Sequence, residues 1–217
     1  MAAEPASEMP DPPYPAASGE RRKLLINLGC GPKGSAWLPA MFSNWREVRV
    51  DLDAEVAPDI LADITDLSAI ESGSVDAIWS AHCIEHVYLH QVSQAVAEAY
   101  RILRDDGFYC LIVPDLQAIA DYIAQDRLHE VVYESPAGPV MAHDMIYGHG
   151  RSIARGRVSM AHRCGFTPSL MLQKLREAPF AEIVMRRRPN QELAAIARKQ
   201  ASASDAEREA FLTALAL

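Results

Sequence analysis

The amino-acid sequence predicts an α/β protein in which helices cover both faces of a mostly parallel sheet. Three observations lead to this class: strand-length apolar runs recur along the chain, amphipathic stretches separate several of them, and the last two runs flank a Pro189-Asn190 turn. Strands that alternate with helices pair in parallel, whereas two strands joined by a tight turn pair antiparallel. We therefore expect seven strands, of which the last two form an antiparallel pair.

Seven segments are predicted as strands. The first is apolar and is followed by a glycine, and in the second Val and Leu alternate with charged residues. In chain order the strands are expected at residues 23–28, 48–52, 60–63, 75–79, 108–113, 183–185 and 193–197. Six residues separate Asp53 from Ile60, whereas a helical crossover needs roughly a dozen or more. The third strand is therefore expected to be short and connected by a loop.

Four segments are predicted as helices, at residues 88–103, 115–128, 167–178 and 204–217. In the first two, apolar residues recur at three- and four-residue spacing, which is typical of a helix with one buried face. The third opens with Thr167-Pro168, an N-cap followed by proline at the first helical position. Gly107 lies in the turn between the first of these helices and the fifth strand, and we expect it to supply a positive φ there.

Composition and charge narrow the range of partners. The chain has 217 residues, 49% of them hydrophobic and 23% charged, which is typical of one globular domain. The net charge is −8, and because the first twenty residues contribute −4, the rest of the chain carries only −4. Without a broad basic surface no nucleic-acid partner is expected, and without a long apolar stretch no membrane partner is expected.

Three parts are expected along the chain. Residues 1–22 are rich in proline and alanine and predict a disordered tail, residues 23–200 predict one domain, and residues 201–217 predict the C-terminal helix. Within the domain, residues 130–165 lack clear periodicity and are expected to form a lid or acceptor-binding region. The four cysteines lie far apart and the N-terminus lacks the pattern of a secretory leader, so a cytoplasmic location is expected.

A glycine-rich turn follows the first strand. Gly29, Gly31 and Gly34 have GxGxxG spacing, which lets a ligand lie against bare backbone. Asp51 lies 22 residues after Gly29, at the end of the second strand, where it can accept hydrogen bonds from both hydroxyls of a ribose. The pattern predicts an adenosine-containing ligand and is shared by sites for NAD and for S-adenosylmethionine (SAM). Pro32 removes an amide that a pyrophosphate would use, which favours a ligand without phosphate.

Further motifs extend this pattern along the chain. Asn27-Leu28-Gly29-Cys30-Gly31 and Val50-Asp51-Leu52-Asp53 are followed by motifs at residues 61–64, 75–80, 84–87 and 99–108. In this order they resemble the motifs of class I SAM-dependent methyltransferases over residues 23–115. A weaker similarity, to small bacterial methyltransferases of undefined substrate, extends to residue 198. The resemblance implies a Rossmann-like fold, an enzyme, and SAM as the cofactor.

The resemblance also implies which residues bind the cofactor. They are Asn27, Gly29, Cys30, Gly31, Asp51, Leu52, Asp63, Ile64, Ser80 and His82. The glycines would face the methionine part of SAM, Asp51 the ribose, and Asp63 with Ile64 the adenine. Ser80 and His82 would border the position of methyl transfer. Asn27 stands where these enzymes commonly have an aspartate.

The expected function is transfer of a methyl group from SAM to an oxygen or nitrogen atom of a small-molecule or glycan-like acceptor. Two alternatives stay open: a SAM-binding sensor or assembly protein without catalysis, and an NAD-dependent oxidoreductase of the same fold. Residues 145–176 contain no acidic residue, and their arginines include Arg151, Arg155, Arg157 and Arg163. These arginines are expected either to bind an anionic part of the acceptor or to form a solvated basic loop.

A general base is needed only where the acceptor must lose a proton. The candidates are His82, His143, Tyr147 and His149, and for each an ordinary structural role is the alternative. His82 also opens the sequence His82-Cys83-Ile84-Glu85-His86, which has the HxxEH spacing of a zinc site. Because this sequence starts three residues after a strand, before a full helix is established, no metal is expected. His86 is expected to cap or pack the following helix.

Three consecutive arginines, Arg186-Arg187-Arg188, end the strand before the Pro-Asn turn. A run of like charges at the end of a strand is typical of a solvated sheet edge, and it discourages pairing with another chain. We therefore expect this run to have no role in binding.

Overall fold

The computed structural model describes residues 21–34, 38–135 and 137–215. Residues 1–20 of the predicted tail and the last two residues of the predicted C-terminal helix lie outside the described residues. Arg21 and Arg22, which the sequence assigned to the tail, lie inside them. Arg21 donates two hydrogen bonds to Asp76, and Arg22 donates to the backbone of Asn44 and Trp45. Contacts with the folded domain therefore include the two residues before the predicted boundary.

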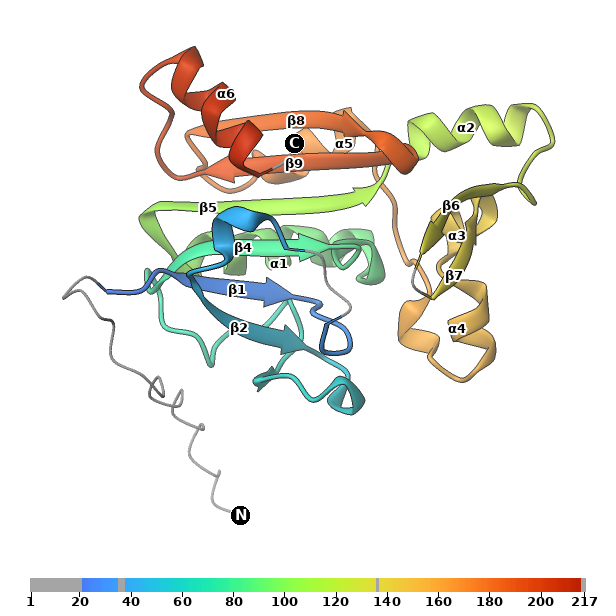
Figure 1. Cartoon of the computed structure of the whole chain (residues 1–217), viewed down its shortest axis with the longest axis horizontal. Coiled ribbons are helices and arrows are strands. Elements are labelled where there is room, and N and C mark those ends of the chain that lie inside the picture. Colours follow the sequence, from blue (N-terminus) through green and yellow to red (C-terminus); the bar gives the residue numbers. More distant parts are fainter. Residues whose placement is uncertain (1–20, 35–37, 136, 216–217) are drawn as a thin grey trace.

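Seven strands form one sheet (Figure 1). The parallel strands are β1 (Leu24–Leu28), β2 (Arg46–Asp51), β3 (Ile60–Leu61), β4 (Val75–Ala81) and β5 (Leu103–Pro114). The strands β8 (Glu182–Arg188) and β9 (Glu192–Arg198) pair antiparallel, and β9 also runs antiparallel to β5. The order across the sheet is β3-β2-β1-β4-β5-β9-β8. The predicted mostly parallel sheet with an antiparallel last pair is confirmed.

The short third strand is also confirmed. β3 has two residues, and the chain reaches it from β2 through a single 3-10 turn, η2 (Ala54–Val56). Leu61 of β3 lies opposite Asp51 of β2 in the ladder. Since no helix covers this connection, Leu61 stays 61% exposed, and the edge of the sheet next to Asp51 is open.

Alternate residues of the strands pack on opposite faces of the sheet. On one face, Leu24 and Ile26 of β1 belong to the core cluster that α1 (Leu89–Ile102) and α5 (Pro168–Leu175) complete. On the other, Leu25 and Trp79 pack with the 3-10 helix η1 (Ala40–Phe42) and with α6 (Asp205–Ala214). In Figure 1, α6 lies in front of the sheet and α1 and α5 lie behind it. Helices therefore cover both faces, as predicted.

The bounds of these helices lie close to the predictions. Thr167 is the N-cap of α5 and accepts from the amide of Leu170, and Ser204 is the N-cap of α6 and accepts from the amide of Glu207. Among the residues that the structure describes, none of the helices is both long enough and apolar enough to cross a bilayer.

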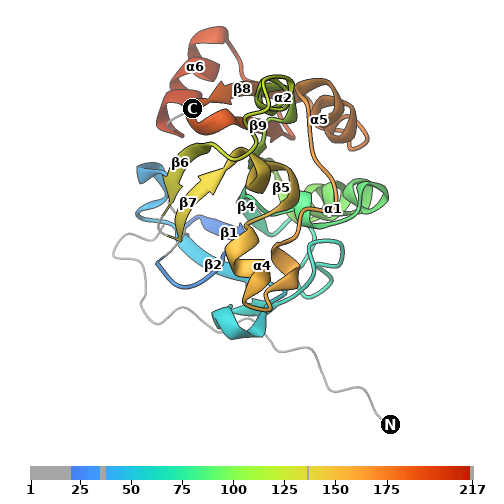
Figure 2. The same cartoon turned by 90° about the vertical axis from the view of Figure 1, so that its right-hand side faces the viewer.

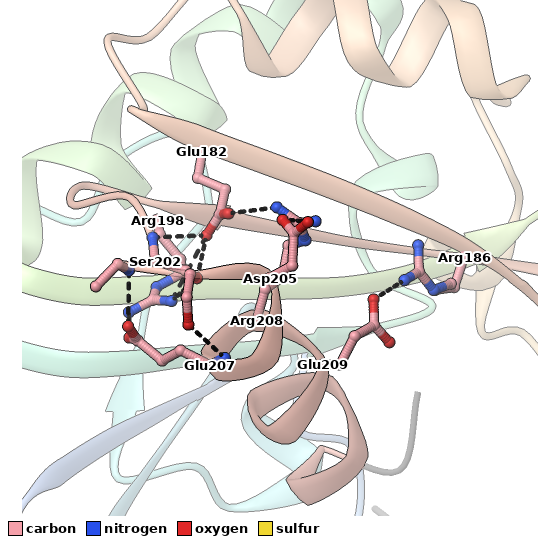
Figure 3. Close-up of polar contacts among 10 residues, drawn as sticks. Glu182, Arg186, Arg198, Ser202, Asp205, Glu207, Arg208 and Glu209 are labelled. Atoms are coloured by element: carbon pink, nitrogen blue, oxygen red, sulfur yellow. Dashed lines mark hydrogen bonds and ion pairs between the residues drawn. The ribbon is translucent and has the colours of Figure 1, made fainter.

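Ion pairs hold α6 against the antiparallel end of the sheet (Figure 3). Arg186 of β8 lies 2.8 Å from Glu209 of α6. Glu182, at the start of β8, lies 3.5 Å from Arg198 of β9 and 3.6 Å from Arg208 of α6. These pairs join the last helix to the two last strands.

The prediction of a solvated edge without a binding role at residues 186–188 is wrong in part. β8 is the edge strand of the sheet, but all three arginines have carboxylate partners. Arg187 donates to Asp115, the N-cap of α2 (Leu116–Ala124), at 2.9 Å, and Arg188 donates to Glu192 of β9 at 3.3 Å. The three arginines therefore link the edge strand β8 to α6, α2 and β9 through ion pairs.

Residues 130–165 have regular structure that the sequence did not predict. They form a hairpin of β6 (Val131–Ser135) and β7 (Gly138–Met141), then α3 (Ala142–Tyr147), α4 (Gly150–Ala154) and the 3-10 helix η4 (Val158–Met160). Figures 1 and 2 show this segment beyond the carboxyl ends of β1, β4 and β5. Each element is too short for a hydrophobic period to mark it.

Two local predictions are wrong. α2 ends at Ala124 and not at residue 128, because Asp126 adopts a left-handed conformation (φ 57°) that a helix cannot include. Gly107 does not have a positive φ. A Cβ on Gly107 would lie 3.1 Å from the carbonyl oxygen of Val75 and 3.0 Å from that of Arg104, so glycine is needed there for close approach of the backbone.

Candidate active site

A large cavity lies at the carboxyl ends of the parallel strands. Its volume is about 800 Å³, within the range of cofactor and ligand sites. The strand ends contribute lining residues that include Asn27, Gly29, Asp51, Asp63 and His82. The 130–165 segment contributes lining residues that include Tyr133, Met145, His149, Arg157 and Arg163. The two regions that the sequence singled out therefore share one cavity.

The turn after β1 presents bare backbone to this cavity. Gly29 and Gly31 have positive φ, at 66° and 59°, a region that residues with a side chain rarely adopt. A Cβ on Gly29 would also lie 2.5 Å from the sulfur of Cys83, so glycine is needed there for space as well as for conformation. The amides of Gly29 and Cys30 donate to the carbonyl of Val50, which ties the turn to β2.

Asp51 joins the end of β2 to the glycine turn. One of its carboxylate oxygens accepts from the amide of Gly31 at 2.9 Å, and the other accepts from the amide of Asp53 at 3.0 Å. Each oxygen can accept a further hydrogen bond, and Asp51 lines the cavity. The backbone therefore holds this carboxylate in place while leaving it able to bind two hydroxyls.

Nine of the ten predicted cofactor-binding residues line the cavity. Asn27 is buried and donates to Glu47 of β2 at 2.8 Å. Burial raises the pKa of Cys30 to about 11, so its thiol stays protonated near neutral pH. The exception is Ser80, which is buried and is not among the lining residues.

His82 lies at the end of β4 between two carboxylates. Its Nε2 is 3.0 Å from Glu192 and its Nδ1 is 3.5 Å from Glu85. Burial acts to lower the pKa of His82, but hydrogen bonding to the two carboxylates and their charges outweigh it and raise the pKa to about 10. The backbone of His82 is left-handed (φ 52°), a strained conformation for histidine. His82 thus lines the cavity with both ring nitrogens turned toward protein partners.

The other three candidates for a general base differ in position. His149 lines the cavity, and its Nδ1 lies 2.7 Å from the hydroxyl of Ser152. Its Nε2 is buried and has no hydrogen-bond partner among the described residues. His143 and Tyr147 are both exposed and pack against each other, with ring centroids 4.8 Å apart. Neither of these two belongs to the lining of the cavity.

Two of the four predicted arginines reach the cavity. Arg157 and Arg163 line it, whereas Arg151 and Arg155 do not. The guanidinium of Arg163 lies over the ring of Tyr88 at 5.1 Å. The guanidinium of Arg157 has no hydrogen bond or ion pair with any other part of the chain that the structure describes. The predicted basic segment therefore divides into two arginines at the cavity and two outside it.

The HxxEH sequence does not form a zinc-binding helix. Ile84–His86 form a single 3-10 turn, η3, so His82 and His86 do not share one face of an α-helix. His86 was expected to cap or pack the next helix. It does not cap that helix, because the N-cap of α1 is Tyr88. The ring of His86 instead packs on His162, with centroids 4.9 Å apart.

Sequence reasoning missed two acidic residues of the site. Glu192 reaches His82 from 110 residues away and opens β9, and no local pattern marks it. Glu85 was considered only as part of the HxxEH sequence. The sequence does mark Glu85, because it is a lone acidic residue between the apolar residues Ile84 and Val87. In the structure Glu85 is fully buried.

A protein family described as a methyltransferase domain matches residues 26–111. The matched range contains the glycine turn, Asp51 and His82, which are the residues that form the strand-end side of the cavity. Residues 26–111 therefore form part of a class I SAM-dependent methyltransferase domain. A methyltransferase domain makes the protein an enzyme that uses SAM as its methyl donor, which sets aside the NAD-dependent alternative. The 130–165 segment lies outside the matched range.

Solved structures share the fold of this methyltransferase. A SAM-dependent methyltransferase from Archaeoglobus fulgidus has a TM-score of 0.56 at 10% identity, over 82% of this chain and 86% of that one. A protein from Pyrococcus horikoshii OT3 has a TM-score of 0.55 at 13% identity, over 83% of each chain. The third is 1,6-didemethyltoxoflavin-N1-methyltransferase from Burkholderia thailandensis, with bound 1,6-didemethyltoxoflavin and S-adenosylhomocysteine. It has a TM-score of 0.51 at 17% identity, over 83% of this chain and 72% of that one. No curated protein matches the chain.

Proposed function

We propose that this methyltransferase transfers the methyl group of SAM to an oxygen or nitrogen atom of a small-molecule acceptor that carries an anionic group. A glycan-like compound is one form of such an acceptor. The observation that carries the proposal is the shared cavity, in which strand-end residues face His149, Arg157 and Arg163 of the 130–165 segment. An acceptor bound by that segment lies beside a donor bound at the strand ends.

The strand-end residues fit the donor. SAM carries an already activated methyl group, so the protein has chiefly to hold and orient it. Bare backbone at Gly29 and Gly31 leaves room for the methionine part, and Asp51 can accept from both ribose hydroxyls. Leu52, which is 57% exposed, and Ile64 line the same side and can pack against the adenine.

The basic residues of the 130–165 segment support an anionic acceptor. A guanidinium binds carboxylate or phosphate oxygens through paired hydrogen bonds. Arg157 lines the cavity without an ion-pair partner among the described residues, so it has donors to offer. The nearby acidic residues Glu85 and Glu192 do not oppose this, because both lie against the imidazole of His82.

His149 is the residue best placed to take a proton from the acceptor. His149 lines the cavity, its Nδ1 is hydrogen-bonded to Ser152, and its buried Nε2 has no hydrogen-bond partner among the described residues. A hydroxyl or amine of an acceptor that reaches this nitrogen can donate to it. His82 is not available for this role, since both of its ring nitrogens face carboxylates. His143 and Tyr147 lie outside the cavity and have no part in the proposal.

The similarity in fold to an enzyme that binds a small molecule supports a small-molecule acceptor. The Burkholderia thailandensis enzyme, which is named an N1-methyltransferase and holds 1,6-didemethyltoxoflavin, has the same fold. The direct test incubates the purified protein with methyl-labelled SAM and the small-molecule fraction of its source cells. A labelled, acidic small molecule is the expected product. Labelling confined to protein or nucleic acid, or no labelling by a protein that binds S-adenosylhomocysteine, would contradict the proposal.

A further inference from the structure

A buried carboxylate and two histidines face one another beside the cavity. Glu85 is fully buried, and its carboxylate oxygens accept no short hydrogen bond within the described chain; Nδ1 of His82, 3.5 Å away, is a nearby donor. One ligand atom from each of Glu85, His86 and His162 lies within 4.8 Å of the other two. His162 Nε2 is 3.9 Å from a Glu85 oxygen. Burying a carboxylate without donors is costly unless a cation compensates its charge.

Hydrogen bonds fix the orientation of the two histidines. Nδ1 of His86 donates to the carbonyl of Ala161, and Nδ1 of His162 donates to the carbonyl of Met145, both at 3.2 Å. A neutral ring with its proton on Nδ1 has a free lone pair on Nε2. Histidines that bind metals commonly donate their outer N–H to a backbone carbonyl in this way.

Backbone contacts hold the three residues together from two distant parts of the chain. The amides of Arg163 and Cys164 both donate to the carbonyl of Glu85, at 2.8 Å and 3.2 Å. The segment that carries His162 is therefore attached to the turn that carries Glu85 and His86. Both histidines also line the cavity, so an ion bound between them would be accessible from it.

We propose that Glu85, His86 and His162 bind a divalent transition-metal ion such as Zn²⁺. Two imidazoles and one carboxylate suit such ions and leave at least one coordination position open. With bonds of about 2.1 Å in a tetrahedral site, ligand atoms lie about 3.4 Å apart. Binding therefore draws the widest pair together by about 1.4 Å from the 4.8 Å limit. The sequence analysis expected no metal here, and the proposed site differs from the HxxEH pattern, because its second histidine is His162 and not His82.

The open position would face the cavity and can take an oxygen or nitrogen atom of the acceptor. This consequence rests on the proposed function, whereas the metal site itself does not. His82 offers the competing account of the cluster, since its imidazole lies 3.5 Å from Glu85 and can compensate the buried charge without a metal. Metal binding by the purified protein separates the two accounts.

The experiment is calorimetric titration of the full-length, untagged protein with Zn²⁺. The wild type is expected to bind one Zn²⁺ per chain, and His86→Gln and His162→Gln are expected to bind it at least about 100-fold more weakly. His143→Gln removes an exposed histidine outside the cavity and is expected to bind Zn²⁺ as the wild type does. Binding of S-adenosylhomocysteine, measured on each variant, reports whether the fold is intact.

Two outcomes overturn the proposal: a wild type that binds no stoichiometric Zn²⁺, or ligand variants that bind it as tightly as the wild type. If the variants fail to fold, Co²⁺ added to the wild type gives a separate readout. Visible absorption bands of bound Co²⁺ that excess Zn²⁺ removes are expected, and their absence also overturns the proposal. Neither titration uses an acceptor, so a failure here leaves the proposed methyl transfer to its own test.

Discussion

The two sides of the cavity are built in different ways. The strand-end side consists of turns that leave consecutive parallel strands, and its main residues, from Asn27 to His82, lie within one continuous stretch of chain. The 130–165 side is a hairpin followed by short helices, none of its elements longer than six residues. The proposed donor side therefore depends on local geometry, whereas the proposed acceptor side depends on contacts between distant segments.

The largest effect is expected from His149→Gln, on the 130–165 side. General-base catalysis contributes about 100- to 10,000-fold to a rate, so kcat is expected to fall by at least about 100-fold while binding of S-adenosylhomocysteine is unchanged. His143→Gln, six residues earlier and outside the cavity, is the matched control. Labelled-methyl transfer to the acceptor measures both. Equal rates for the two variants would remove His149 from the mechanism.

The next largest effect is expected from Gly29→Ala, on the strand-end side. A side chain at this positive φ costs about 1–2 kcal/mol, and overlap with Cys83 costs roughly 1–3 kcal/mol more. Affinity for S-adenosylhomocysteine is therefore expected to fall by roughly 100-fold or more. Gly34 also has a positive φ, but a Cβ there would meet no other atom within 4 Å. Gly34→Ala is therefore expected to lose about 5- to 30-fold in affinity. Equal losses, measured by calorimetry, would show that the contact with Cys83 is unimportant.

A smaller effect is expected from charge reversal in the basic segment. Arg157→Glu is expected to raise the acceptor KM by about tenfold, because an exposed charge contact at this site contributes on the order of 1 kcal/mol. Arg155→Glu makes the same change two residues earlier, outside the cavity, and is expected to leave KM unchanged. Steady-state kinetics at two salt concentrations measures both. An equal rise in KM in the two variants would indicate that the overall electrostatic field of the segment attracts the acceptor, and not a contact with Arg157.

The smallest effect is expected at the opposite end of the sheet. Asp76, at the start of β4, accepts from Arg21 and from the amide of Leu24. Burial acts to raise the pKa of Asp76, but these hydrogen bonds and the charge of Arg21 outweigh it and lower the pKa. Such a carboxyl stabilises the folded state above its unfolded pKa of about 3.9, and this stability is lost as the pH falls through the lower folded pKa.

The free energy of unfolding is therefore expected to decline below about pH 4, and less steeply in Asp76→Asn than in the wild type. Urea unfolding at a series of acidic pH values measures the slope. Arg21→Ala is expected to cost about 1 kcal/mol or less at neutral pH, because Arg21 is half-exposed. Parallel slopes for Asp76→Asn and the wild type would mean that this carboxyl is not linked to folding.

Much of the strand-end side could be predicted from the sequence. Glycines that follow a strand, together with an aspartate that ends the next one, form a pattern specific to nucleoside-binding turns. Gly29, Gly31 and Asp51 lie where they were expected. Ser80 was misplaced because side chains alternate along a strand. Its neighbour Ala81 lines the cavity, whereas Ser80 is buried away from it.

The 130–165 side could not be predicted to the same degree. His149 and His143 look alike in the sequence, and only the fold of α3 and α4 places one at the cavity and the other outside it. His162 reaches Glu85 across 77 residues, and Glu192 reaches His82 across 110 residues. Neither contact leaves a local pattern, because both depend on how separate segments pack at the ends of the strands.

The division of the cavity into a donor side and an acceptor side is tested most directly by titrating three variants with S-adenosylhomocysteine. Asp51→Ala is expected to bind at least about 30-fold more weakly than the wild type, since two hydrogen bonds to a charged group are lost. Asp53→Ala, which removes a carboxylate outside the cavity, and Arg157→Glu are expected to bind as the wild type does. Undiminished affinity in Asp51→Ala, or an equal loss in Arg157→Glu, would contradict this division.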